Sequence, residues 1–567
     1  MAEGMVGDHV LTAGRIMSVK GERARLAGWV ALALVPLAFL AIFFLLPLLG
    51  MLGRGLAPDG ALDFSGVTEV LGRSRTQRVI AFTVGIAALA TAVTVVLGVP
   101  VSYALHRLSI PGAAVLRAIV VMPFVLPTVV VGVMWRSLLA PSGLLGGLGL
   151  DGSWVAILLA MVFFNVAVVV RTVGPAWEGL DPRTAEAAAA LGAPPRVVAR
   201  TVLLPALMPS VLSAASVVFL FCSTAFGIVL TLGGLRYATV ETEIYLLTTS
   251  MLDLRGAAVL SLVQLVAVAA MLWVTERIRA RTSGVTRRGR VAAPLRPVGW
   301  THLPVLAATG IVLVLVILPI AGGVIRSLRR GDEWTLANYA GLADTFPTVG
   351  VSPLTALGSS WRIAVDAALL AVVLGLIVSL VVSRRPRSPG CRRVLSVLDA
   401  TFMLPLGVSA VTIGFGFLIT LDRPPLDLRS SPVLIPIAQA MVALPLVVRT
   451  IAPVLRAVDP RQGQAAATLG ASPWRSWLTV ELPLLWRPLL AAVGFALAVS
   501  LGEFGATSFL VRPDKPTLPV VIYQLIGRPG AETQGVAMAA AVLLTVVTVA
   551  VMGLVERLRV GSVGSFA

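Results

Sequence analysis

The sequence has little charge for its length. Only 13% of its 567 residues are charged, whereas about a quarter of the residues in an ordinary soluble domain are charged. Hydrophobic residues make up 57% of the chain, and many separate apolar runs reach the ~20 residues that a helix needs to cross a bilayer. This composition excludes a set of soluble domains and predicts an all-α polytopic membrane protein.

Lysine, cysteine and histidine are also scarce. A phosphate-binding P-loop ends in Lys-Ser or Lys-Thr after several glycines, and neither of the two lysines, Lys20 and Lys515, has that context. The two cysteines, Cys222 and Cys391, give neither a disulfide framework nor metal-ligand spacing. The three histidines are far apart. We therefore predict no metal site, no bound cofactor, no catalytic residue and no ATP-hydrolysing activity in this chain. A polytopic membrane enzyme is disfavoured for the same reason.

The formal net charge of +18 comes almost entirely from arginine. Clustered basic residues can indicate nucleic-acid binding, but these arginines lie in short loops beside apolar runs, where the positive-inside rule places them. Seven arginines fall within residues 276–300 and five within 384–393. These segments are predicted to be cytoplasmic, and with an even number of spans both termini are cytoplasmic as well. Nucleic acid is not expected as a partner; the lipid bilayer is.

Apolar runs predict about twelve transmembrane helices, six in each half of the chain. The first six lie near residues 29–50, 79–105, 115–134, 154–170, 204–230 and 257–274. The second six lie near residues 303–324, 363–382, 394–419, 432–448, 482–510 and 536–554. The predicted organisation is a cytoplasmic N-terminal segment (1–28), a first half (29–275), a basic cytoplasmic linker (276–300), a second half (301–556) and a cytoplasmic tail (557–567).

An internal repeat relates the two halves. Residues 171–207 and 449–485 align without a gap at an offset of 278, with 18 identities in 37 positions. The same offset places Phe226-Gly227 on Phe504-Gly505 and Ile244-Tyr245 on Ile522-Tyr523. Two homologous six-helix halves are therefore fused in one polypeptide.

The repeated segment contains a polar loop, near 171–203 in the first copy and 449–481 in the second. Asp181 and Asp459 each precede a proline, which predicts a capping side chain before the first helical residue. Gly192 and Gly470 then end the helix in a left-handed conformation. The predicted short helices span 185–191 and 463–469. Because the surrounding spans have diverged while this loop has not, we interpret it as a docking element for another protein rather than as an ordinary interhelical connection.

This loop resembles the EAA loop of ABC-importer permeases of the type I fold. Glu186-Ala187-Ala188 with Gly192 and Leu204-Pro205 carries the resemblance, and in the second copy Gln464 replaces the acid. The resemblance implies a coupling helix that sits in a cleft of a nucleotide-binding subunit. The coupling residues it implies are Asp181, Glu186, Ala187 and Gly192 in the first loop and Asp459, Gln464, Ala465 and Gly470 in the second.

The likeness is closest to fused permeases of the ferric-iron and thiamine importer group, supported by residues 230–245 and 500–527. It implies an inner-membrane permease for thiamine or ferric iron, although another small organic or inorganic ion remains an alternative. Two copies of the loop imply two ATP-binding cassette subunits, which would hold the ATP and Mg. Because the outer loops are short, a separate extracytoplasmic substrate-binding protein is also expected.

Polar residues inside apolar runs are candidates for the translocation path, because an ionisable group in a span is costly. They are Glu503, Ser223, Thr224 and Asn165. For Glu503, an interhelical hydrogen bond or an arginine partner is the purely structural alternative. Proline-containing stretches at 122–127 and 404–405 are expected to break helices, either to line a cavity or as simple kinks.

An ion-coupled secondary transporter is the alternative function, since such folds also contain repeats. It would need no ATPase, and a duplicated docking loop would serve no purpose in it. The sequence therefore favours an ATP-driven importer that works by alternating access.

Overall fold

The structure is a computed structural model of the chain. It describes residues 28, 31–57, 60–61, 63–234, 236–282, 295–331, 333–347, 349–384, 388–422, 424 and 427–560. Nearly all of the predicted N-terminal segment (1–28), residues 283–294 of the predicted linker and residues 561–567 of the predicted tail lie outside the described residues.

Ten helices in the described part of the chain are long and apolar enough to cross a membrane. The all-α class is thereby confirmed, since the described strands are β1 (Arg329–Arg330) and β2 (Glu333–Trp334), a two-stranded antiparallel hairpin. Six of the ten are single elements: α4 (Ser74–Arg107), α7 (Trp154–Glu178), α13 (Leu254–Thr282), α16 (Pro353–Val382), α19 (Leu434–Ala457) and α25 (Ala531–Val560). The other four are composite: Ala31–Leu56 contains η1 (Ala41–Leu45) and α2 (Leu46–Leu56), and Pro195–Ser223 contains α9 (Pro195–Val198), η4 (Ala199–Leu203) and α10 (Leu204–Ser223). Trp300–Ser327 contains η5 (Trp300–His302) and α14 (Leu303–Ser327), and Trp477–Gly502 contains η8 (Trp477–Glu481) and α22 (Leu482–Gly502).

The third predicted span of each half is broken by a short turn instead of running as one continuous helix. In the first half, α5 (Ala113–Val121) runs into the 3-10 turn η2 (Met122–Val125), and α6 (Thr128–Leu139) departs at 105°. If this bent pair is counted as one span, the described part of the chain has eleven candidate membrane-crossing helices. In the second half, α17 (Pro389–Met403), η7 (Leu404–Gly407) and the 11-residue α18 (Ala410–Thr420) repeat the pattern. Prolines within both turns remove backbone donors and so prevent a continuous helix.

The fifth span of each half also ends earlier than predicted. α10 stops at Ser223, and the chain continues into α11 (Gly227–Leu232) and α12 (Val240–Thr249). α22 stops at Gly502 and is followed by α23 (Thr507–Leu510) and α24 (Leu518–Ile526). A Cβ atom on Gly227 would lie 2.5 Å from Thr128 Oγ1, and one on Gly505 would lie 3.0 Å from Ala410 Cβ. Glycine at these two positions therefore lets the short helices approach α6 and α18 closely.

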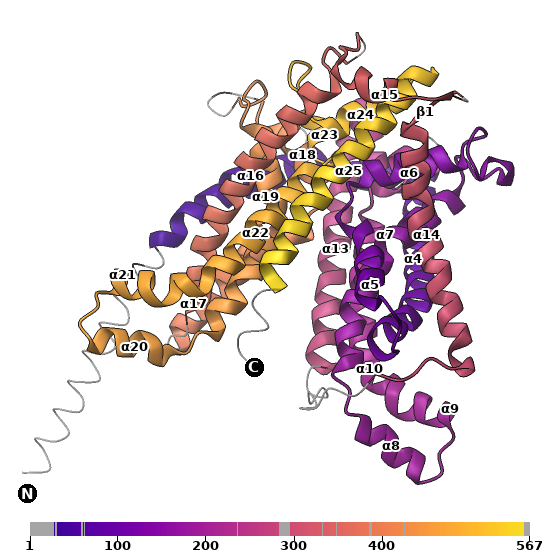
Figure 1. Cartoon of the computed structure of the whole chain (residues 1–567). Helices are drawn as coiled ribbons and strands as arrows, with labels where there is room; N and C mark the ends of the chain where they lie inside the picture. Colours follow the sequence, from indigo (N-terminus) through magenta and orange to yellow (C-terminus); the bar gives the residue numbers. More distant parts are fainter. Residues whose placement is uncertain are drawn as a thin grey trace, which may run out of the picture.

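The first helix of each half packs against the other half. α14 contacts α4, α5, α6 and α7 of the first half, while α2 contacts α18 of the second. Arg54 Nη2 donates to Ile419 O at 3.2 Å, and the Phe43 and Phe417 rings lie 6.0 Å apart. Figure 1 shows α14 beside the first-half helices and the N-terminal helix, in indigo, among the second-half helices. The sequence halves 29–275 and 301–556 are therefore not separate bundles.

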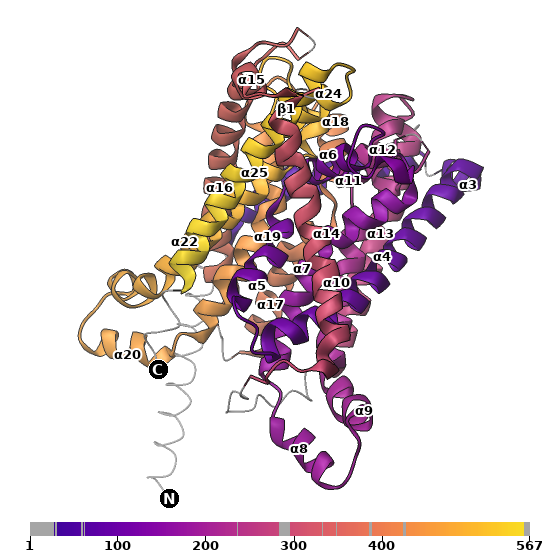
Figure 2. The same cartoon turned by 45° about the vertical axis from the view of Figure 1, so that its right-hand side comes forward.

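The two ends of the molecule differ in how the halves meet. At one end, which we call the closed end, the short helices α11, α12, α18 and α24 lie together (Figures 1 and 2). Across the halves, α12 contacts α18, and α24 contacts α6. At the other end, which we call the loop end, α8 (Pro182–Ala190) and α20 (Pro460–Thr468) project from the two halves and lie apart from each other.

Two arginines at the start of α4, Arg73 and Arg75, are held in ion pairs at the closed end. Arg75 makes two hydrogen bonds to the buried carboxylate of Glu243, at 2.6 and 2.8 Å. Arg73 Nη1 lies 2.6 Å from Asp253 Oδ2. Burial by itself would raise the pKa of Asp253, but hydrogen bonds from Arg73 and from the Gly256 N–H outweigh it and hold that pKa below its ordinary value. These basic side chains therefore tie α4 to the α12–α13 connection.

Candidate functional site

Two exposed loops at the loop end have the same construction. Asp181 Oδ1 accepts a hydrogen bond from the Arg183 backbone N–H at 3.0 Å and begins α8. Asp459 Oδ1 accepts from the Arg461 backbone N–H at 2.9 Å and begins α20. Each helix starts at the proline that follows its capping acid, three residues before the predicted start. The aspartate caps satisfy backbone donors that would otherwise lack partners at the first turn.

Both short helices end at a left-handed glycine. The φ angle is 83° at Gly192 and 79° at Gly470, a region that side chains disfavour. The loops are shorter than predicted, because α7 continues to Glu178 and α19 to Ala457. A spanning helix resumes at Pro195, so the first loop covers 179–194 instead of 171–203. In the second copy the connection begins at 458 instead of 449.

A leucine stands exposed beside each of these glycines. Leu191 and Leu469 are related by the 278-residue offset, and both side chains are 89% exposed. Glu186 and Gln464, which differ between the copies, are exposed as well, as are Ala187 and Ala465. Isolated apolar residues are common on protein surfaces. The same exposed leucine on both copies of a repeated, capped helix is an apolar contact available to a partner.

A chamber of about 450 Å³ lies between the two halves. Its walls come from η2, α7, α10 and α12 of the first half, together with the turn before α18 and the end of α22 in the second. The described residues that line it include no arginine, lysine or histidine. Most of the wall is apolar, and the phenylalanines in it are Phe124, Phe164, Phe221, Phe226, Phe495 and Phe504.

Three of the four predicted path residues line this chamber. Asn165, Thr224 and Glu503 do so, whereas Ser223 does not. Ser223 Oγ donates to Leu220 O of its own helix at 2.9 Å, and Thr224 Oγ1 donates to the same carbonyl. The placement brings residues of α7, α10 and α22 together around one space, and their part in transport stays a prediction.

Glu503 serves as a local helix cap as well as a chamber wall. Its Oε1 accepts from the Ala506 N–H at 2.7 Å, and its Oε2 accepts from the Thr507 N–H at 3.0 Å and from Thr507 Oγ1 at 2.5 Å. These donors come from the turn that leads into α23. The structural role differs from the interhelical bond or arginine partner considered from sequence.

Asn165 has one unused hydrogen-bonding atom. Its Nδ2 donates to Met161 O at 2.9 Å and faces Cys222 Sγ at 3.4 Å. Its Oδ1 has no hydrogen-bond partner among the described residues, although only 2% of the side chain is exposed. Buried acceptors without partners are rare in proteins, so this oxygen is a feature that the fold alone does not explain.

Glu241, which the sequence analysis did not single out, is a second buried acid at the chamber. Its carboxylate accepts from Gln264 Nε2 of α13 and, at 3.0 Å, from Ser409 Oγ of the second half. Ser409 also caps α18. The rule that marks Glu503, an acid in apolar surroundings, would have marked Glu241 too. It was missed because residues 231–256 fall between the predicted spans 204–230 and 257–274, where no buried helix was expected.

Four aromatic rings join the halves above the chamber. Phe226 and Phe504 stack with ring centroids 5.5 Å apart and an interplanar angle of 23°. Tyr245 packs on Phe226 at 5.4 Å, and Tyr523 packs on Phe504 at 5.4 Å. Both pairs are related by the 278-residue offset, so the cluster follows the symmetry between the halves. We call these four residues the aromatic barrier.

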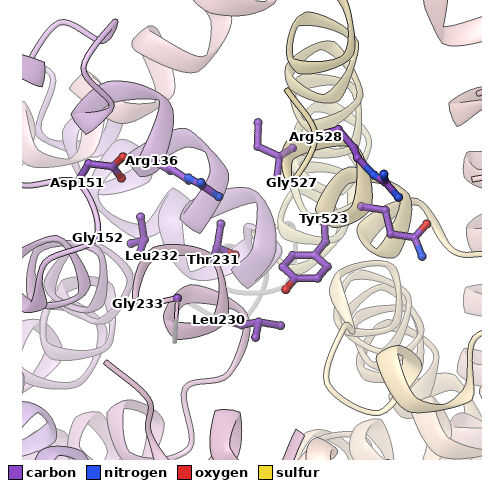
Figure 3. A pocket seen from close by; sticks show the side chains of 13 residues that line it. Arg136, Asp151, Gly152, Leu230, Thr231, Leu232, Gly233, Tyr523, Gly527 and Arg528 are labelled. Atoms are coloured by element: carbon purple, nitrogen blue, oxygen red, sulfur yellow. The ribbon is translucent and has the colours of Figure 1, made fainter. Parts of the chain in front are cut away.

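A second cavity, of about 570 Å³, adjoins the aromatic barrier. Tyr523 lines this cavity, whereas Phe226 and Phe504 line the chamber. Figure 3 shows Arg136 on the first half and Arg528 on the second half flanking the space. We call it the vestibule. Chamber, aromatic barrier and vestibule thus follow one another along the boundary between the halves.

Comparison with known proteins places most of the chain in one family. The family model for the inner membrane component of binding-protein-dependent transport systems matches residues 98–284 and again residues 371–559. The two matches correspond to the two repeated halves and leave out the exchanged first helices.

Several relatives resemble the chain over most of its length. The thiamine transport system permease protein ThiP of Escherichia coli strain K12 is 28% identical over 79% of this chain and 83% of its own length. ThiP of Brucella abortus strain 2308 is 28% identical over 85% and 87%. The probable ABC transporter permease protein y4fN of Sinorhizobium fredii is 25% identical over 96% and 99%. The chain therefore belongs to the family of inner membrane components of binding-protein-dependent transport systems, as a fused two-half ABC-importer permease that spans the inner membrane several times.

Proposed function

We propose that this chain forms the translocation path of a thiamine importer. The observation that carries the proposal is the likeness, over most of both chains, to relatives named as thiamine transport system permeases. The chamber supports it, because a wall rich in phenylalanine with carboxyl groups and no basic side chain suits an aromatic cation such as thiamine. Ferric iron, which the sequence alone left open, has no comparable support among these relatives.

Energy is supplied, in this proposal, by two separate ATPase subunits that bind ATP and Mg. One would dock on α8 and the other on α20, with Leu191 and Leu469 entering apolar clefts. Both loops have the same caps, glycines and exposed leucines, which supports docking of the two ATPase subunits in the same way. The polar contacts would differ, because the first loop has Glu186 where the second has Gln464.

The loop end faces the cytoplasm in this proposal, and the closed end faces outward. The first helix runs from Ala31 toward α3 (Ser65–Gly72) at the closed end, and α25 starts beside α15 (Ala337–Ala340) at that same end. Both termini would then be cytoplasmic. A substrate-binding protein would dock over the vestibule, where Arg136 and Arg528 are exposed.

Alternating access then follows from the arrangement of the halves. The closed aromatic barrier and the separated loops correspond to an inward-facing state. ATP binding would draw α8 and α20 together, and the halves would rock so that the barrier rings separate. The exchanged first helices support such a motion, because each half carries a helix packed on the other.

Transport by reconstituted vesicles tests this proposal. The chain is purified with the subunits that remain bound, inserted into liposomes, and supplied with its binding protein and radiolabelled thiamine. Uptake that requires ATP on the loop side is expected. Uptake that runs on an ion gradient without any ATPase would identify a secondary transporter, and ATP-driven uptake of ferric iron but not thiamine would overturn the substrate.

A further inference from the structure

We propose that the chamber is itself a binding site for one aromatic cation that carries hydrogen-bond donors, with Asn165 Oδ1 as the acceptor that orients it. The proposal rests on the proposed function, and it adds that the permease selects its solute rather than only passing what the binding protein delivers. Its evidence lies in the unused acceptor, the aromatic wall, the absence of basic side chains from the described lining and the asymmetry of the halves.

The orientation of the Asn165 amide is determined by its neighbours. Its nitrogen lies 2.9 Å from the Met161 carbonyl oxygen, and turning the amide over would place two acceptors face to face. Oδ1 is therefore left without a partner in a wall residue that is 2% exposed. A bound solute that donates an N–H to this oxygen would satisfy it, because a buried unpaired acceptor costs about 1–3 kcal/mol.

An aromatic wall adjoins this acceptor. Phe164 precedes Asn165 on α7, and the Phe124 ring packs between Phe164 and Phe221, with centroids at 5.7 and 5.9 Å. All three rings line the chamber. Aromatic faces attract both flat rings and positive charge, so this wall suits a planar cationic ring.

The polar groups of the chamber also favour a cation over an anion. Glu241 and Glu503 contribute carboxyl groups from opposite halves, and the described lining contains no basic side chain. The hydroxyl groups of Thr224 and Ser409 donate to protein acceptors. The volume of about 450 Å³ falls within the range of small-molecule pockets.

Among the described residues that line the chamber, Asn165 alone has a buried side-chain acceptor without a partner. The 278-residue offset places Ala443 of α19 opposite Asn165, so the second half supplies no matching amide. A single off-centre site for one solute follows, instead of two symmetric ones. The same comparison shows that this helix position accepts alanine.

Binding of radiolabelled thiamine to the purified complex, without the binding protein, tests the inference. Asn165→Ala is expected to weaken binding about tenfold, as loss of one hydrogen bond to a charged solute implies, and to lower uptake while ATPase stimulation by the binding protein persists. Ser216→Ala, on α10 outside the chamber lining, is the matched control.

Two results would overturn the inference. One is unchanged binding and uptake in Asn165→Ala while the wild-type chain transports thiamine. The other comes from competition experiments on the wild-type chain, which need no variant to fold. If small aromatic anions displace radiolabelled thiamine as effectively as aromatic cations do, the inference is wrong. If the wild-type complex transports no thiamine at all, the proposed function fails, and titration with a set of aromatic cations and anions still decides whether the chamber selects cations.

Discussion

Replacing the exposed leucines of the two loops tests docking without disturbing the fold. Leu191→Ala and Leu469→Ala alter side chains that are each 89% exposed. Because neither leucine is buried within the chain, its removal should leave the free energy of unfolding of the permease nearly unchanged. Alanine is also the best helix former, so α8 and α20 should keep their structure.

The expected loss of docking energy follows from the area that a partner would cover. Leucine buried in an apolar cleft contributes about 1.5–3 kcal/mol, at roughly 0.8 kcal/mol per CH₂ group. Truncation to alanine should therefore cost about 2 kcal/mol for each loop, which corresponds to about a thirtyfold weaker interaction. The double variant should lose both contacts, while each single variant keeps one intact loop.

Co-purification of the ATPase and ATPase activity stimulated by the binding protein are the two measurements. We expect both to fall in the double variant and partially in each single variant, with unchanged thermal unfolding of the isolated permease. Leu191→Met and Leu469→Met preserve the apolar volume and serve as matched controls that should dock normally. Wild-type docking and coupling in the double alanine variant would show that the leucines do not enter the partner and would refute the reasoning.

Three further predictions concern the loop glycine, the aromatic barrier and the closed end. Gly192→Val should distort the end of α8, since a β-branched residue at a φ of 83° is strained by about 1–2 kcal/mol. ATPase activity stimulated by the binding protein should therefore fall. Gly192→Asn should keep this activity, because asparagine tolerates the left-handed conformation. The double variant Phe226→Ala with Phe504→Ala should open the aromatic barrier, so vesicles that contain it should leak small solutes without ATP. Vesicles with leucine at both positions should stay sealed. If vesicles with the alanine pair do not leak, these rings do not close the path. Arg75→Ala leaves the buried Glu243 carboxylate without its charged hydrogen-bond partner and should lower the free energy of unfolding by about 1.5–3 kcal/mol, measured by thermal melting. Adding Glu243→Gln should recover part of this loss, and an equal loss in the double variant would exclude the ion pair as the cause.

The two capped loops at the loop end could be predicted closely from sequence because their determinants are local. An aspartate before a proline begins a helix, and a glycine after an alanine-rich stretch ends it, whatever surrounds them. Asp181 and Gly192 therefore adopt the predicted conformations. The exposed leucines were not predicted, since hydropathy does not show that Leu191 has no neighbour in the folded chain.

The chamber was predictable only in part. Asn165 and Glu503 are detectable as polar residues in apolar runs, and both line the same space. Sequence could not show that Glu503 caps α23 or that Ser223 turns back to its own helix, because these depend on where the fifth span breaks. Glu241 was missed because it lies in a helix formed at the closed end by tertiary packing.

The sequence by itself determined the membrane class, the duplication, the two capped loops and the breaks at proline, because composition, repetition and local backbone chemistry are encoded residue by residue. Only the tertiary structure decided that the first helices are exchanged between the halves, that Phe226 meets Phe504, and that Asn165 and Glu241 border one chamber. These contacts join residues tens to hundreds of positions apart, and they depend on which apolar faces pack together. Hydropathy makes every spanning face equally acceptable to lipid, so the choice among partners rests on side-chain shape and on where buried polar groups find one another.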